Sequence, residues 1–208
     1  MRKNKRLLNQ ITLAVILLVI DFLYLILVGI SLITNMDLVT NKNMQYSLHI
    51  TVILSAIVYL LFVLNIYHDE NKKKYGKAAF AFSILFFALV LTGRFTGIIT
   101  LFSNNITNSV FNFYGNFSIS RNIELVAWTT LFPVSVLFLA AVFWKKGKCG
   151  TLLSGLCFAS AICCFIGFMS FFSSNIIFLM IGITGWGLLF IMIIIMYIIY
   201  QTKKGNYG

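Results

Sequence analysis

Six long apolar runs dominate this sequence of 208 residues, and they constrain its fold more than any other feature. They cover residues 11–34, 47–67, 78–102, 124–144, 150–172 and 175–200. A helix needs about 20 predominantly apolar residues to cross roughly 30 Å of hydrocarbon, and each run is long enough. Backbone polar groups must be satisfied within the spanning structure, and no run shows the alternation of a barrel strand. The sequence therefore predicts an all-α, polytopic integral membrane protein with six transmembrane helices.

Composition argues against a separate soluble domain. Apolar residues make up 60% of the chain and charged residues only 10%, against about 25% charged in an ordinary soluble domain. We therefore expect residues 1–208 to form a single six-span membrane domain, one bundle whose main partner is the lipid bilayer. The net charge of +11 is carried by short clusters between the spans, so we expect no nucleic-acid partner.

The distribution of Lys and Arg predicts the direction of the bundle. Basic residues cluster at the N-terminus and at positions 72–77, 145–148 and 203–204, whereas the alternate connections carry only Lys42 and Arg121. Positive charge is retained on the cytoplasmic side, so we predict a multi-pass protein of the cell membrane with both termini in the cytoplasm. The many Lys, Asn, Ile and Phe residues favour a bacterial source with an AT-rich genome.

Two charged residues lie inside the predicted spans. Asp21 is near the middle of the first span, where a carboxylate costs about 2.5 to 3.5 kcal/mol. Arg94 lies roughly 12 Å from the outer end of the third span at 1.5 Å per residue. If these helices are neighbours, the two side chains can pair in the outer half of the bundle. The alternatives are that the pair only fixes helix register, or that Arg94 extends outward to the interface.

Other polar residues lie at a similar depth on the second and fourth spans. His49 and Thr51 begin the second span, where we expect His49 to be solvated near the interface. Pro133 removes a backbone hydrogen bond and frees the carbonyl of Thr129, which the hydroxyl of Thr129 or Thr130 can satisfy. The sequence thus predicts a modest outer-leaflet pocket built from Asp21, His49, Thr51, Arg94, Trp128 and Thr129.

Small residues indicate where helices touch, because helices in lipid associate through close backbone approach. Four of them recur every fourth residue on the fifth span: Gly155, Ala159, Cys163 and Gly167. We expect a neighbouring helix to lie against this stripe, and such stripes are also compatible with a homo-oligomer.

The sequence predicts neither a metal site nor a cofactor. The four cysteines lie close together without His or carboxylate neighbours, so we expect small buried hydrophobic residues rather than metal ligands: Cys149, Cys157, Cys163 and Cys164. Glycine-rich nucleotide loops, HExxH helices and GxSxG elbows are also missing from the sequence.

Three segments carry a resemblance to a known family: the residues from Trp128 to Pro133, the basic turn at 145–148, and Gly185-Trp186-Gly187. Together they resemble the androgen-induced six-span membrane family. The resemblance implies six spans in one bundle, and characterised animal members are threonine hydrolases that act on fatty-acid esters of hydroxy fatty acids.

The resemblance also assigns residues. The family's nucleophilic threonine corresponds to Thr51, and its histidine corresponds to Trp128. A threonine hydroxyl needs a nearby base, and an indole cannot accept its proton. His49 is two residues from Thr51, and positions two apart on a helix diverge. The threonine hydrolase-like site is therefore incomplete, which argues against an enzyme.

Two functional hypotheses follow. The first is a membrane protein that binds or processes a lipid or amphipathic ester near the outer leaflet, with Thr51 as the candidate catalytic residue. The alternative is a non-catalytic transport, accessory or immunity-type membrane subunit.

Overall fold

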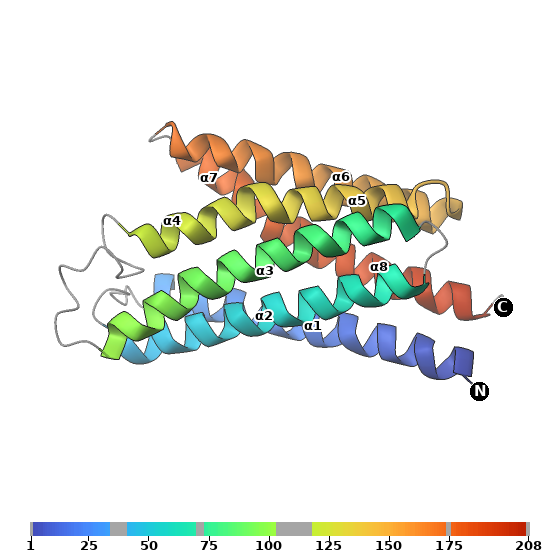
Figure 1. Ribbon diagram of the computed structural model, residues 1–208, viewed down its shortest axis with the longest axis horizontal. Helices are drawn as coiled ribbons and strands as arrows, with labels where there is room; N and C mark the ends of the chain where they lie inside the picture. The colour runs from blue at the N-terminus through green and yellow to red at the C-terminus, as the bar shows by residue number, and fades with distance from the viewer. Residues whose placement is uncertain (1, 34–40, 70–72, 103–117, 174–175, 207–208) are drawn as a thin grey trace.

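The computed structural model describes residues 2–33, 41–69, 73–102, 118–173 and 176–206, and every element in these ranges is helical. The first three helices are α1 (Arg2–Ile33), α2 (Lys42–Asp69) and α3 (Lys73–Phe102). The later elements, in chain order, are α4 (Ile119–Val126), η2 (Ala127–Leu131), α5 (Phe132–Phe143), α6 (Gly147–Phe168), η3 (Met169–Phe171), α7 (Ile176–Ile183), η4 (Thr184–Leu189) and α8 (Phe190–Asn206). They form one elongated bundle, in which α4, η2 and α5 continue one another and so do α7, η4 and α8 (Figure 1).

The prediction of six membrane-spanning helices is confirmed in length and composition. The apolar stretches are Leu8–Ile30, Lys42–His68, Lys74–Phe102, Ile119–Phe143, Gly147–Phe171 and Ile176–Lys204. The second and fourth begin about a turn earlier than the apolar runs predict. At α2 the side chain of Asn41 accepts a hydrogen bond from the Met44 amide at 3.1 Å. At α4 the side chain of Ser118 accepts one from the Arg121 amide, also at 3.1 Å. Such caps start a helix in polar sequence, ahead of the hydrophobic run.

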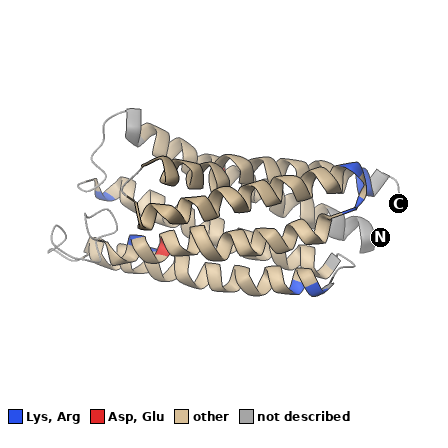
Figure 2. Ribbon diagram, turned by 90° about the horizontal axis from the view of Figure 1, so that it is seen from above, with Lys and Arg blue, Asp and Glu red and all other residues tan. Residues whose placement is uncertain are grey.

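Both termini lie at one end of the bundle, which we call the terminal end (Figure 1). The start of α3 and the turn between α5 and α6 lie at the same end, whereas α2 and α4 begin at the opposite, far end. Most of the Lys and Arg positions of the described chain also gather at the terminal end (Figure 2). The apolar bundle therefore has a basic end and a far end with few basic residues.

Aromatic residues fill the centre of the bundle. Tyr59 of α2 is buried, and its ring centroid lies 5.4 Å from Phe132, 5.5 Å from Phe190 and 5.7 Å from Phe86. Its hydroxyl is hydrogen-bonded to the hydroxyl of Ser135 at 2.8 Å. One aromatic side chain thus joins four of the six spans.

The contact face of α6 differs from the predicted stripe of small residues. Gly155 and Ala159 are exposed, whereas the second half of the stripe is closely packed. A Cβ on Gly167 would lie 2.7 Å from the Cα of Gly182, and a Cβ on Gly185 would lie 2.9 Å from the Cβ of Cys163. The reason is geometric: four residues advance about 40° beyond a full turn of an α-helix, so a strict spacing of four drifts around it. The buried face instead mixes steps of three and four: Gly150, Leu153, Ser154, Cys157, Ser160, Ala161, Cys164 and Gly167.

Candidate ligand-binding cavity

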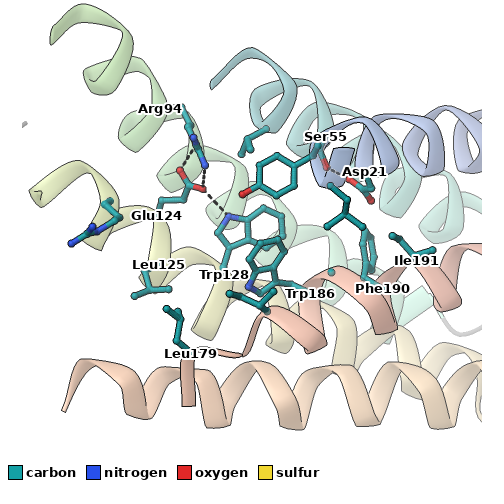
Figure 3. Close-up of a pocket in the computed structure, with 16 residues that line it drawn as sticks. Asp21, Ser55, Arg94, Glu124, Leu125, Trp128, Leu179, Trp186, Phe190 and Ile191 are labelled. Carbon is teal, nitrogen blue, oxygen red and sulfur yellow. Dashed lines mark hydrogen bonds and ion pairs between the residues drawn. The ribbon is translucent and has the colours of Figure 1, made fainter. Parts of the chain in front are cut away.

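A cavity of about 170 Å³ lies in the half of the bundle nearer the far end. Its walls come from α1, α2, α3, α4, η2, α7, η4 and α8 (Figure 3). The polar side chains that line it are Asp21, Ser55, Arg94, Arg121 and Glu124. The remaining walls are aromatic, aliphatic or glycine: Tyr24, Leu25, Val52, Leu125, Trp128, Leu179, Ile183, Trp186, Gly187, Phe190 and Ile191.

A buried ion pair forms one wall. Arg94 of α3 donates from Nη2 to Oε1 of Glu124 of α4 at 2.6 Å, and its Nε forms an ion pair with Oε2. The indole of Trp128 donates to the same Oε1 at 3.1 Å. Both charged residues are almost fully buried, at 3% and 5% exposure. A two-pronged pair of this kind fixes orientation as well as charge, so Arg94 and Glu124 hold the indole in place.

A glycine on α3 brings α4 close enough for this pair to form. A Cβ on Gly93 would lie 2.8 Å from the carbonyl oxygen of Ser120, so only glycine permits this approach. One turn further on, the hydroxyls of Thr96 and Ser120 are hydrogen-bonded at 2.7 Å. Arg94, the residue after Gly93, therefore lies at the interface between α3 and α4, where Glu124 of α4 is within reach.

Asp21 forms the polar group of the opposite wall. It accepts a hydrogen bond at Oδ1 from the hydroxyl of Ser55 of α2 at 2.6 Å. Its other oxygen, Oδ2, is buried and has no hydrogen-bond partner among the described residues. The predicted Asp21–Arg94 pair is therefore wrong, although both residues line one cavity. The reason lies in helix order, because α1 packs against α2 and α8, whereas α3 carries α4 beside it.

Two tryptophans meet in the cavity, each on a π-helical segment. Trp128 lies on η2 and Trp186 on η4, with ring centroids 5.1 Å apart and an interplanar angle of 36°. Tyr24 of α1 lies 6.1 Å from the ring of Trp186. Wider turns of this kind are frequent at functional sites. Here they turn both indoles toward the same space (Figure 3).

Pro133 accounts for the first π-helical segment. It is the second residue after η2 ends, and the Phe132 amide donates a hydrogen bond to the carbonyl of Ala127, five residues back. The hydroxyls of Thr129 and Thr130 donate to the carbonyls of Leu125 and Val126 at 2.7 Å and 2.6 Å. The expectation that one of these hydroxyls satisfies the Thr129 carbonyl is thus not met, because both hydroxyls reach back four residues, toward the start of the helix.

The other predicted site residues lie outside the cavity lining. Thr51 is buried and its hydroxyl donates to the carbonyl of Ser47 at 2.7 Å. Thr129 is likewise buried in the helix interface. His49 is fully buried, with Nδ1 3.4 Å from Nη1 of Arg94. The expectation of a solvated His49 is wrong because α2 begins at Lys42, which places His49 nearly two turns inside the helix.

Glu124, Ser55 and Arg121 are the functional candidates that the sequence argument missed. Glu124 is the first residue of the fourth apolar run, and an arginine inside a membrane commonly pairs with an acidic residue. Only Asp21 and Glu124 lie within the predicted spans as acids. The sequence therefore offers two acidic residues, Asp21 and Glu124, as candidate partners for Arg94.

Comparison with protein-family models, with curated proteins and with solved structures gives no match to this chain. The resemblance to the androgen-induced family therefore stays a prediction, and the function has to be argued from the cavity.

Proposed function

We propose that this protein binds an amphipathic molecule non-catalytically in a cavity within the outer half of the cell membrane. The observation that carries the proposal is the composition of the cavity walls, which combine a buried carboxylate and an ion pair with two indoles and several aliphatic side chains. Pockets that are mostly apolar, with a few fixed polar groups, are the usual sites for small organic ligands.

The orientation of the bundle supports the choice of the outer half. The terminal end carries most of the described Lys and Arg positions, and the positive-inside rule directs such an end to the cytoplasm. The cavity lies toward the far end, and so toward the outer leaflet. A reporter that fluoresces only in the cytoplasm, fused to the C-terminus, should fluoresce. A dark fusion in folded protein would reverse the orientation.

The arrangement of the cavity supports a ligand that enters from the lipid. Leu25 of α1 and Arg121 of α4 both line the cavity and are exposed. Leu179 and Ile183 of α7 line the same cavity, and α7 packs chiefly against α6. An apolar chain could therefore leave the cavity between α1 and α7, while its polar head lies near Asp21.

Binding is better supported than ester cleavage. The candidate nucleophile Thr51 has its hydroxyl committed to a backbone carbonyl and does not line the cavity. The residue in the place of the family's histidine, Trp128, donates its N–H to Glu124. A nucleophile needs a base within hydrogen-bond reach, and neither group offers that geometry toward the cavity.

Two glycines allow a matched test of the proposal. Gly187 lines the cavity, and a Cβ there would meet no atom within 4 Å. Gly155 has the same freedom but faces outward from α6. Gly187→Leu should fill the cavity, whereas Gly155→Leu adds the same side chain elsewhere. Both changes replace glycine in a helix, so their intrinsic effects on helix stability are similar.

The assay is equilibrium binding in lipid nanodiscs. The probes are a monoacylglycerol, a lysophosphatidylcholine and dodecyltrimethylammonium, and thermal stability is measured alongside. We expect at least one probe to bind saturably and to raise the melting temperature of wild type and Gly155→Leu, but not of Gly187→Leu. Equal binding to all three proteins, or saturable binding to none, would reject the proposal.

A further inference from the structure

We infer that the cavity recognises a cationic head group, an ammonium carried on an apolar tail, through Asp21 and the faces of Trp128 and Trp186. This inference rests on the proposed function and names the class of ligand. It combines the charge balance of the cavity, the aromatic faces that line it, and its size.

The charge balance comes first. Four acidic or basic side chains line the cavity, and Arg94 and Glu124 neutralise each other in their ion pair. Arg121 is exposed. The remaining carboxylate, Asp21, receives only the neutral hydroxyl of Ser55 among the described residues, and its Oδ2 is buried without a partner. The inner part of the cavity therefore holds an acidic group whose negatively charged form a bound cation would stabilise.

The aromatic faces supply the second element of a cation site. An ammonium is attracted to the face of an aromatic ring within about 6 Å, most strongly to tryptophan, and quaternary ammonium groups are typically held in aromatic cages. Trp128, Trp186 and Tyr24 all line this cavity. In Figure 3 the two indoles stand between the Arg94–Glu124 pair on one side and Asp21 on the other. A cation bound to the indole faces that are turned toward Asp21 would therefore lie near its carboxylate.

Rigid support keeps these faces in place. The indole nitrogen of Trp128 is bonded to Glu124, and its ring packs edge-on against Phe86 at 4.7 Å. Trp186 follows Gly185, where a Cβ would lie 2.8 Å from the carbonyl oxygen of Ser160. The Ser160 hydroxyl donates to the Gly185 carbonyl at 2.8 Å. The Trp128 indole is thus held by Glu124 and Phe86, and the backbone beside Trp186 is anchored to α6, which reduces the ordering cost of binding.

The size of the cavity limits what fits inside. Apolar cavities of about 150 Å³ accept a benzene-sized group, so 170 Å³ holds a head group and not a whole lipid. The tail must then lie along Leu25, Leu179 and Ile183, which line the wall formed by α1 and α7. A trimethylammonium head on a single alkyl or acyl chain matches this shape.

The same head-group chemistry has two sources, a choline lipid or a free amphipathic cation such as an alkyltrimethylammonium. A choline lipid also carries a phosphate, which exposed Arg121 could meet where it lines the cavity. Arg121→Gln should therefore weaken binding of lysophosphatidylcholine several-fold and leave dodecyltrimethylammonium unchanged if the lipid is the natural ligand. If Arg121→Gln changes neither, the free cation is the better assignment. If the choline lipid does not bind at all while the cation does, the free cation is likewise the ligand.

The decisive comparison uses dodecyltrimethylammonium and its neutral isostere, in which carbon replaces the nitrogen. The nanodiscs contain no choline lipid, so that the bilayer does not compete. We expect the wild type to bind the cation at least tenfold more tightly than the isostere. Asp21→Asn keeps an oxygen to accept from Ser55 and should abolish that preference. Equal affinity for the two probes in wild type, or an undiminished preference in folded Asp21→Asn, would overturn the inference.

A second variant keeps the test valid if Asp21→Asn does not fold. Trp186→Leu removes one aromatic face while retaining an apolar side chain. It should weaken binding of the cation about threefold to tenfold relative to the isostere, and an unchanged ratio would contradict the inference. Failure here is distinct from failure of the proposed function. If both probes bind equally and Gly187→Leu blocks both, the cavity still binds amphipaths, and only the assignment of a cation is wrong.

Discussion

The pair between Arg94 and Glu124 leads to a quantitative prediction about stability. Removing one partner of a buried ion pair leaves an uncompensated charge and costs about 3 to 5 kcal/mol. Both residues are nearly fully buried and joined at two points, so we expect Arg94→Met and Glu124→Leu each to destabilise the fold by that amount. Additive effects would then give a double variant weaker by roughly 6 to 10 kcal/mol.

The double variant should instead be much more stable than the sum predicts. It leaves neither of the two charges, and its residual cost is the loss of a partner for the Trp128 indole and for the buried His49 ring, about 1 to 3 kcal/mol each. The coupling energy is therefore several kcal/mol. Unfolding free energies in bicelles, obtained by steric trapping, measure it directly.

A second cycle serves as the control. Asp21→Asn and Arg94→Met share no direct partner, so their effects should add to within about 0.5 kcal/mol. Additivity of Arg94→Met with Glu124→Leu, or strong coupling of Arg94→Met with Asp21→Asn, would refute the pairing described above.

Two other predictions concern helix packing and the candidate nucleophile. Gly93→Ala places a Cβ 2.8 Å from the backbone oxygen of Ser120. It should lower the free energy of unfolding by about 1 to 3 kcal/mol, because it forces α4 away from α3. The control is Gly155→Ala, which has open space around it and should leave the free energy of unfolding unchanged or raise it by up to about 1 kcal/mol. Thr51 should show no covalent labelling by a fluorophosphonate in folded protein, since its hydroxyl serves a backbone carbonyl. Specific labelling that disappears in Thr51→Ala would restore the hydrolase hypothesis.

Much of the architecture could be predicted because a bilayer requires it. Each apolar run had to become a helix, and Asp21 and Arg94 had to face the bundle interior. Both line the cavity, together with Trp128. Hydropathy alone was less informative at the helix ends, where Asn41 and Ser118 start α2 and α4 within polar sequence.

The contacts within the site could not be predicted, because hydropathy does not say which helices are neighbours. Arg94 had two carboxylates within reach of its depth, Asp21 and Glu124. The choice was decided by Gly93, which lets α4 approach α3. Likewise, the meeting of Trp128 with Trp186 depends on two π-helical segments far apart in the sequence. The pattern of residues along one helix does not indicate which residues of another helix it contacts.

The central claim is that the cavity beside the tryptophan pair takes up an amphipathic molecule. The chain has three tryptophans, and the third, Trp144, is exposed at the end of α5. In a Trp144→Phe variant the emission therefore comes from Trp128 and Trp186 alone. Titration with amphipaths brominated in the tail, with neutral and with trimethylammonium heads, should quench this emission to a plateau that an excess of unlabelled probe reverses. The claim would be contradicted by quenching that rises in proportion to the probe concentration in the bilayer without reaching a plateau, and that is the same in Gly187→Leu.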